Sequence, residues 1–428
     1  MRHLKDRAGL DQVRRDMEFM CNTVGRRLAG SPEEERVADY MVGRLRELGA
    51  TSVGKLPFSV QRWLPAPAVL TDLDSGRRIE VGQVTHSLST PPEGVEGDLA
   101  IIEPFEYEHG MRLDGLEGKI GLFYGGYGES AELFRQMQES PLKALLYVDT
   151  RYATEWPIAM GMGEKFMRMV KKPMASVSMM DAWALARSGA RRVRLTCSGR
   201  IEPAASWNAV GEFSGSDPAG RVIVISGHLD SVSVGAGADD NASGIAATLE
   251  CARRLRGKGL RHTLRFIGFG DEEQLSVGAM RYVESQAADL DRVAFVFNHD
   301  AIGAYLGSSE IQCTGTQEMD YYVKAVAETR LRFGKVVAGV CPYQDMFPFA
   351  MRGIPGVWLT RPTHGSQYWY HHSVHSDLGA VSIEQIAWTA EVTSEIVGDL
   401  ARHESWPFER RLAPEMREKC ERYMRELF

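Results

Sequence analysis

Apolar residues in the second half of the chain gather in short runs that alternate with amphipathic segments. Four runs are rich in β-branched and aromatic residues and lack polar alternation, which is typical of strands buried on both faces; they are residues 222–226, 263–269, 293–298 and 357–360. Helical periodicity predicts helices at 245–255, 279–285, 317–328 and 383–397. This alternation indicates a largely parallel sheet with helices on both faces.

Helical periodicity also marks both ends of the chain. Two helices are expected at 9–24 and 32–49, and Ser31 and Glu34 supply a cap signal for the second. A last helix is expected at 414–427. Its apolar stripe would pack on the body of the molecule or on a second subunit of a homodimer, because its opposite face mixes acidic and basic residues.

The region between these parts has shorter apolar runs, and its expected strands are 99–102, 120–124, 144–148, 175–177 and 193–197. No group of His, Asp and Glu with ligand spacing stands there. We therefore predict an α/β fold in which a mixed, largely parallel central sheet is flanked by helices and carries an inserted mostly-β domain. The inserted domain would be residues 61–199, and the larger, discontinuous domain would be residues 1–60 and 200–428.

Composition narrows the class of protein. The chain has 428 residues, of which 44% are hydrophobic and 25% charged, as in globular proteins with a sizeable core. Its net charge is −7 and it has no basic block, which argues against a nucleic-acid partner. The charged N-terminus and the lack of an apolar run of about 18 residues predict no secretory signal and no membrane span. Six scattered cysteines without a Cys-x-x-Cys pair predict free thiols in a reducing cytoplasm.

Polar residues follow the first of the predicted parallel strands, where the chain reads GHLDSVSVGAGADDNASG. His228 and Asp230 come directly after the apolar run, and Asp239 and Asp240 come just before the next helix. An open α/β sheet binds its ligands at the carboxyl edge of its parallel strands. One strand–loop–helix unit therefore places an imidazole and several carboxylates at this edge.

The next two strands end in the same way. The acidic run Asp271-Glu272-Glu273 follows the second strand, and His299-Asp300 follows the third. A cation at this edge would offset the repulsion within the acidic run. Because successive strand residues point to opposite faces, only one of His299 and Asp300 is expected to face the site, and we choose Asp300.

Three histidines within five residues, His371, His372 and His375, supply the nitrogen donors that the carboxylates lack. A set of His, Asp, Glu, Asp and His suits zinc or another borderline divalent ion rather than calcium. Five ligands exceed one tetrahedral zinc and suit two ions that share a bridging carboxylate and a bridging water. One member of the Glu272-Glu273 pair would be a ligand, and the other would take the proton of the water and pass it to the leaving amine.

These stretches resemble the co-catalytic zinc aminopeptidase family, which also holds plasma glutamate carboxypeptidase and glutaminyl cyclase. The resemblance covers roughly residues 209–401 and is carried by GHLDSVSVGAGADDNASG, FIGFGDEE, FNHDAIG and HHSVHSD. It implies the zinc exopeptidase type of α/β fold. The region 61–199 resembles a protease-associated domain through GKIGLFYGG and ALLYVDT.

The resemblance also implies roles for individual residues. His228 and Asp300 would bind the first ion, Glu273 and His372 the second, and Asp240 would bridge them. Glu272 would be the general base, and Asp230 would orient the ring of His228 through its other nitrogen.

The sequence leaves open which of the neighbouring histidines is the last metal ligand. The family usually has an Asp four residues after this His, whereas Asp377 lies five residues after His372. His372 is our choice because Ser373 follows it, but His371 and His375 remain alternatives. A second departure is Gln344-Asp345-Met346, where relatives often have Ser-Asp-His, and it concerns the substrate side of the site.

We therefore predict a metallo-exopeptidase, specifically an aminopeptidase that uses two zinc ions, a metal-bridging water and a Glu base to remove N-terminal residues from peptides. Co²⁺ or Mn²⁺ can substitute in such sites. The alternatives are a related zinc dipeptidase, carboxypeptidase or amidohydrolase, and an inactive receptor-like scaffold. The inserted domain is expected to affect substrate range or oligomeric state more than metal binding.

Overall fold

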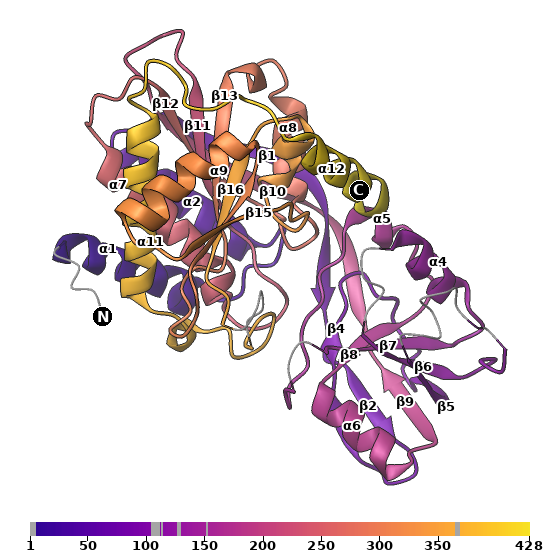
Figure 1. Ribbon diagram of the computed structural model, residues 1–428. Helices are drawn as coiled ribbons and strands as arrows, with labels where there is room; N and C mark the ends of the chain where they lie inside the picture. The colour runs from indigo at the N-terminus through magenta and orange to yellow at the C-terminus, as the bar shows by residue number, and fades with distance from the viewer. Residues whose placement is uncertain (1–5, 104–111, 113, 126–129, 151–152, 364–368) are drawn as a thin grey trace.

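Two eight-stranded sheets organise the chain, and they lie in different parts of the molecule in Figure 1. The structure is a computed structural model that describes residues 6–103, 112, 114–125, 130–150, 153–363 and 369–428. The first sheet has the strand order β1-β10-β12-β11-β13-β16-β14-β15. The second has the order β3-β2-β9-β5-β6-β7-β8-β4 and is built from residues 69–196, in the region that the sequence predicts to be an insertion and that is called the inserted region below.

Parallel strands form the centre of the first sheet. β11 (Val222–His228) pairs in parallel with β12 (Thr263–Phe269) and with β13 (Val293–His299), and β13 pairs in parallel with β16 (Gly356–Thr360). Every residue of β11, β12 and β13 is buried, as unbroken apolar runs predict.

Antiparallel pairs complete this sheet at its edges, because β10 pairs antiparallel with β12 and β14 with β16. The strands outside the parallel centre are β1 (Thr51–Pro65), β10 (Gly199–Phe213), β14 (Glu310–Thr314) and β15 (Lys335–Ala338), with β1 and β15 at the two edges. The predicted fold class, a mixed and largely parallel sheet flanked by helices, is confirmed.

Successive side chains of the central strands pack into two hydrophobic cores, one on each face of the sheet. Ile223 and Ile225 of β11 lie in one core, whereas Val222 and Val224 lie in the other. The first core is covered by α1 (Arg7–Glu18), α2 (Pro32–Glu47), α7 (Gly244–Leu255), α9 (Gln317–Lys324) and α11 (Ile383–Leu400). The second is covered by α8 (Val277–Ser285) and α10 (Phe347–Met351).

The predicted helices near the N-terminus are present with small differences. Ser31 caps α2 as expected, because its hydroxyl accepts the N–H of Glu34 at 3.1 Å. The Glu34 carboxylate does not close a capping box on Ser31; instead it accepts the N–H of Gly30 and the hydroxyl of Ser206, each at 2.7 Å. The helix predicted at 9–24 is α1 followed by a π-helical segment, η1 (Phe19–Val24).

The second sheet contains parallel as well as antiparallel pairs. Its strands are β2 (Val69–Asp72), β3 (Arg78–Glu80), β4 (Gly82–Gln83), β5 (Val95–Ile102), β6 (Ile120–Tyr124), β7 (Ala144–Val148), β8 (Met174–Val177) and β9 (Arg192–Thr196). β5, β6, β7 and β8 are parallel to one another. The described residues of this region form the helices α4 (Ala131–Glu139), α5 (Glu164–Met167) and α6 (Met179–Ser188).

Two long strands join the sheets. β1 and β10 each have 15 residues and pair antiparallel from Thr51 opposite Glu212 to Pro65 opposite Gly199. Figure 1 shows this ribbon running from the first sheet toward the second. The apolar pattern of the sequence did not predict either strand, and many of their residues are exposed or half-buried.

A shared hydrophobic core also connects the two parts. It contains Phe134 and Phe166 from the inserted region and Phe347 from the part built on the first sheet. The C-terminal helix α12 (Pro414–Leu427) adds Tyr423 and Leu427 to this core. No helix among the described residues is both long enough and apolar enough to cross a bilayer.

Candidate metal centre

The predicted strand-end residues come together at the carboxyl edge of the first sheet. His228 ends β11, and its Nε2 lies 2.9 Å from Asp240 Oδ1 and 3.7 Å from Asp300 Oδ1. Glu272 Oε2 lies 3.8 Å from the same nitrogen. These side chains meet because β11, β12 and β13 are parallel and adjacent, so the segments that follow them leave the sheet at one edge.

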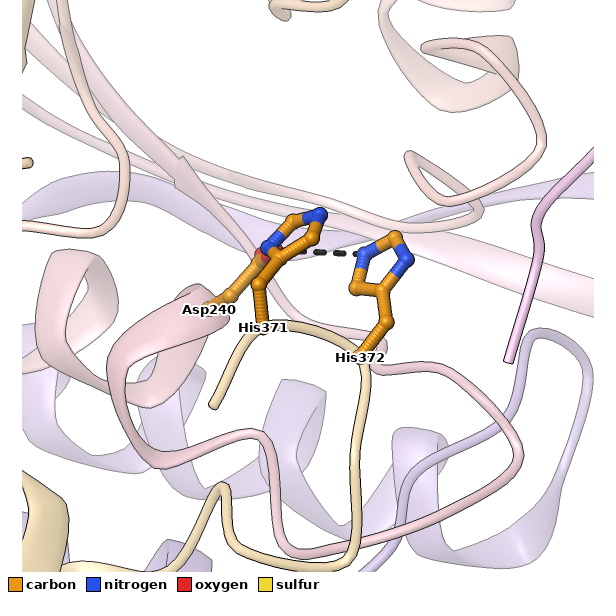
Figure 2. Close-up of side chains that lie close together, drawn as sticks. All are labelled: Asp240, His371 and His372. Carbon is orange, nitrogen blue, oxygen red and sulfur yellow. Dashed lines mark ion pairs between the residues drawn. The ribbon is translucent and has the colours of Figure 1, made fainter. Parts of the chain in front are cut away.

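A second group shares the carboxylate of Asp240. His372 Nε2 lies 3.0 Å from Glu273 Oε2 and 3.4 Å from Asp240 Oδ2. Figure 2 shows His371 and His372 rising from one loop, with the Asp240 carboxylate beside their rings. Asp240 thus turns one oxygen toward His228 and the other toward His372.

The three histidines of the last motif differ in position. The rings of His371 and His372 are stacked, with centroids 3.6 Å apart. His371 Nδ1 lies 3.4 Å from Asp240 Oδ2, but only His372 is paired with both Asp240 and Glu273. His375 packs against Trp156, with ring centroids 4.2 Å apart.

Asp230 supports the site from behind. Its two carboxylate oxygens accept the backbone N–H groups of Glu272 and Glu273 at 2.9 and 3.1 Å. Oδ1 also lies 3.5 Å from His228 Nδ1. Asp230 therefore fixes the acidic turn and faces the ring nitrogen of His228 that is turned away from Asp240.

Arg27 is a supporting residue that the sequence analysis missed. Its side chain is fully buried, and its guanidinium donates to the carbonyls of Leu229 at 2.8 Å, of Ala236 at 2.5 Å and of Gly237 at 3.1 Å. These carbonyls belong to the loop between β11 and Asp240. Nothing in the local sequence distinguishes Arg27 from the exposed Arg26 beside it.

Asp239 ties the ligand-bearing loops together. It accepts the hydroxyl of Tyr370 at 2.6 Å and the N–H of Gly303 at 2.6 Å. Burial raises the pKa of Asp239 to about 7. The loops that carry Asp240, Asp300 and the histidine pair therefore share one carboxylate that is not itself among the predicted ligands.

Asp345 is a further buried carboxyl group beside the site. It is fully buried, and within the described part of the chain neither of its oxygens has a hydrogen-bond partner. Burial raises its pKa well above the ordinary value, against the influence of the His228 charge. The sequence analysis noted this position only as part of a departure from the family pattern.

The charges of the site favour a cation. Burial alone would lower the pKa of His228, but the carboxylates of Glu272, Asp230, Asp240 and Asp300 hold it well above its ordinary value. Burial would also lower the pKa of His372, but Glu273 and Asp240 raise it to about 10. Burial raises the pKa of Glu272 well above its usual range.

The donor set also fits a divalent ion. Glu273 Oε1 is buried and has no hydrogen-bond partner among the described residues. The carboxylate and imidazole atoms of His228, Asp240 and Asp300 lie within 4.8 Å of one another, as do those of Asp240, His371 and His372. Mixed nitrogen and oxygen donors at such spacing are typical of zinc sites.

A cavity of about 720 Å³ opens onto these residues. One wall is acidic and comes from the first sheet and its loops; it contains Asp240, Glu272, Glu273 and Asp300. The opposite wall comes from the inserted region, including residues 158–163, and from Tyr423 and Leu427 of α12. No Lys or Arg is among the described residues that line the cavity.

Comparisons with known proteins find similar peptidases. Residues 208–397 match the model of Peptidase family M28. Carboxypeptidase Q from Bos taurus is 26% identical in an alignment of length 407 that covers 90% of this chain and 84% of that protein. Aminopeptidase YwaD from Bacillus subtilis is 24% identical in an alignment of length 398 that covers 91% of this chain and 84% of that protein. The structure of BSAP, a zinc aminopeptidase from Bacillus subtilis, has a TM-score of 0.73 at 21% identity and covers 95% of this chain and 98% of that one.

Proposed function

We propose, from the match of residues 208–397 to peptidase family M28, that the chain is an aminopeptidase that removes N-terminal residues from peptides with two zinc ions. This match and the similar peptidases confirm the predicted resemblance and the predicted class of enzyme, a metallo-exopeptidase. What we propose is which end of the substrate is recognised, how many ions bind and what each residue does.

The choice of an aminopeptidase rests on the acidic lining of the cavity. A carboxypeptidase commonly binds the terminal carboxylate of its substrate through Arg or Lys. The described lining of this cavity has neither, and it contains Asp149 in addition to the four acidic residues of the candidate metal centre. An acidic wall suits the ammonium group of a free N-terminus.

The distances support the following division of ligands. His228 and Asp300 hold the first ion, Glu273 and His372 hold the second, and Asp240 is shared. His372 is favoured over His371 because it also faces Glu273, and over His375 because that ring packs against Trp156. When bound, two zinc ions supply a polarised scissile carbonyl and a water of lowered pKa.

Glu272 is then the proton carrier. Burial raises its pKa, which favours uptake of a proton. Its Oε1 accepts the hydroxyl of Ser276 at 3.3 Å, which holds the carboxylate against the acidic turn. The carboxylate takes the proton of the attacking water and delivers it to the amine that leaves.

The proposal is tested by zinc content and turnover of leucyl p-nitroanilide on one purified sample. We expect two zinc ions per chain and activity that is lost on chelation. Glu272→Gln should keep both ions and lower kcat by about 10²–10⁴-fold. Glu284→Gln on the exposed side of α8 is the control and should leave both quantities unchanged. Full activity of Glu272→Gln with bound zinc would refute the role of this residue.

A substrate panel separates the alternatives. Hydrolysis of free-amine peptides but not of N-acetylated ones is expected for an aminopeptidase. Cleavage of N-acetylated peptides with a free C-terminus would support a carboxypeptidase, as the name of Carboxypeptidase Q suggests for that relative. Cleavage restricted to dipeptides would support a dipeptidase.

We also propose that residues 61–199 are a protease-associated-like domain inserted into a peptidase domain made of residues 1–60 and 200–428. The separate second sheet and its own core of Leu70, Ile120, Leu146 and Val193 support this division. The antiparallel ribbon of β1 and β10 crosses both proposed boundaries and would be the connection between the two domains.

A further inference from the structure

We propose that residues 158–161 of the inserted region are part of the metal centre and position the ring of His372. The inference rests on the proposed function, since it takes His372 and Glu273 as ligands of the second ion. It reverses the expectation from the sequence that the inserted region acts on substrate range more than on metal binding.

Two hydrogen-bonding contacts join Ala159 to His372. The N–H of Ala159 donates to the carbonyl of His372 at 2.7 Å, and the carbonyl of Ala159 lies 3.1 Å from His372 Nδ1. A histidine that donates its Nδ1–H to a carbonyl keeps the lone pair of Nε2 free for a metal, and its ring orientation is fixed. Nε2 is the atom that faces Glu273 and Asp240.

The backbone of His372 needs such support. Its φ is 53°, in the left-handed region that residues other than glycine rarely adopt. A conformation of this kind persists where the surrounding contacts determine it. The N–H of Ala159 meets the carbonyl of this same residue, so the inserted region holds both the backbone and the ring of His372.

The segment is itself anchored on the second sheet. The N–H of Met160 donates to Gln83, and the carbonyl of Met160 accepts from Thr85, each at 2.9 Å. On the other side of Ala159, the carbonyl of Ile158 accepts the hydroxyl of Ser176. Because backbone groups of an extended segment alternate in direction, Ile158 and Met160 bind the inserted sheet while Ala159 between them binds the histidine loop.

Gly161 brings the same segment against the other proposed ligand of the second ion. A Cβ atom at Gly161 would lie 2.0 Å from the carbonyl oxygen of Glu273, so only glycine allows this approach. Glu273 Oε2 in turn lies 3.0 Å from His372 Nε2. The segment therefore touches both residues of the second ligand pair, and its loss should act on the second ion rather than the first.

The test uses the full chain loaded with zinc. Gly161→Ala should push the segment away from Glu273, and Ala159→Pro should remove the N–H that binds His372. Gly54→Ala is the control for the first variant, because a Cβ there meets no atom within 4 Å. Ala159→Gly is the control for the second, because it keeps both backbone groups.

The readout is the zinc retained per chain after dialysis against graded chelator, with near-ultraviolet circular dichroism to confirm the fold. We expect the unmodified protein and both controls to retain two ions. Gly161→Ala and Ala159→Pro should retain the first ion and bind the second about 10–100-fold more weakly.

The outcomes separate the two proposals. No zinc in the unmodified protein would refute the proposed function. Two equally tight ions in every folded variant, or equal weakening of both ions, would overturn the role of residues 158–161 and leave the function standing. Should both variants fail to fold, the unmodified ¹⁵N-histidine-labelled protein loaded with zinc still decides: a His372 ring protonated at Nε2 rather than Nδ1 would overturn the inference.

Discussion

At the scale of single residues, two buried charged side chains beside the site are held by backbone groups. Asp230 accepts two backbone N–H groups of the acidic turn, and Arg27 donates to the carbonyls of the loop that leads to Asp240. A backbone dipole satisfies a buried charged group without neutralising it. The carboxylates of the site consequently keep their capacity to bind a cation.

Replacing Arg27 by Met tests this arrangement. The variant leaves several buried carbonyl oxygens without their donor, so we expect the free energy of unfolding to fall by about 2–4 kcal/mol. The measurement is urea denaturation at constant zinc concentration. Arg26→Met is the matched control, because Arg26 is exposed and donates one hydrogen bond, to Ser233, and it should change stability by about 0.5 kcal/mol or less. Equal effects of the two substitutions would contradict the role given to Arg27.

At the scale of elements, three parallel strands and one terminal helix define the cavity. β11, β12 and β13 deliver four of the five proposed ligands to one edge of the sheet, because parallel strands all end on the same side, and His372 comes from the loop after β16. α12 lies against the inserted region, and its Tyr423 and Leu427 belong both to the shared core and to the cavity wall. The last helix of the chain therefore connects the wall of the cavity with the core that joins the two sheets.

Shortening Leu427 measures the contribution of α12. Its side chain is 3% exposed in the shared core, so Leu427→Ala should lower the free energy of unfolding by about 2–5 kcal/mol. Met424 on the same helix is 43% exposed, and Met424→Ala serves as the control with little expected change. Both values come from denaturant titrations followed by circular dichroism. If Leu427→Ala left the free energy of unfolding unchanged, α12 would not stabilise the shared core.

At the scale of the whole molecule, several contacts hold the two sheets together besides the pairing of Ala159 with His372. The ribbon of β1 and β10 runs between them, the shared core packs Phe134 and Phe166 against Phe347, and Arg281 of α8 forms an ion pair with Glu164 at 2.9 Å. The hydrophobic contact should dominate, because the ion pair is partly exposed and such pairs contribute little. Tertiary contacts therefore attach the inserted region to the rest of the molecule, in addition to the chain connections.

This construction predicts cooperative unfolding. We expect one calorimetric transition for the full chain, with a ratio of calorimetric to van't Hoff enthalpy close to one, because loss of the shared core would expose apolar surface on both parts. Fluorescence and far-ultraviolet circular dichroism should give the same midpoint. Two resolved transitions would show that the second sheet unfolds separately, and Leu427→Ala would then be expected to affect only one of them.

The sequence predicted the polar residues at the strand ends, because local patterns of apolar and polar residues mark them. Buried parallel strands are unbroken apolar runs, and the polar residues that follow them stand out; the fold class and the family resemblance predicted in this way are confirmed. The seven proposed site residues were chosen from these patterns together with the resemblance, and their assignment stays a prediction although their side chains lie together. Their order along the chain already implied one edge of one sheet.

The tertiary structure decided what has no local pattern. β1 and β10 are long but half-exposed, so they lack the apolar run by which the other strands were found. The sequence does not distinguish Arg27 from its exposed neighbour Arg26, and Arg27 is buried only because the loop before Asp240 packs against it. The contact between Ala159 and His372 uses backbone atoms, which every residue carries, so no sequence reports it. By itself the sequence determined which side chains are available for chemistry, because residue types and their spacing are local; only the fold decided which distant backbone groups hold them, because that depends on how separate sheets pack.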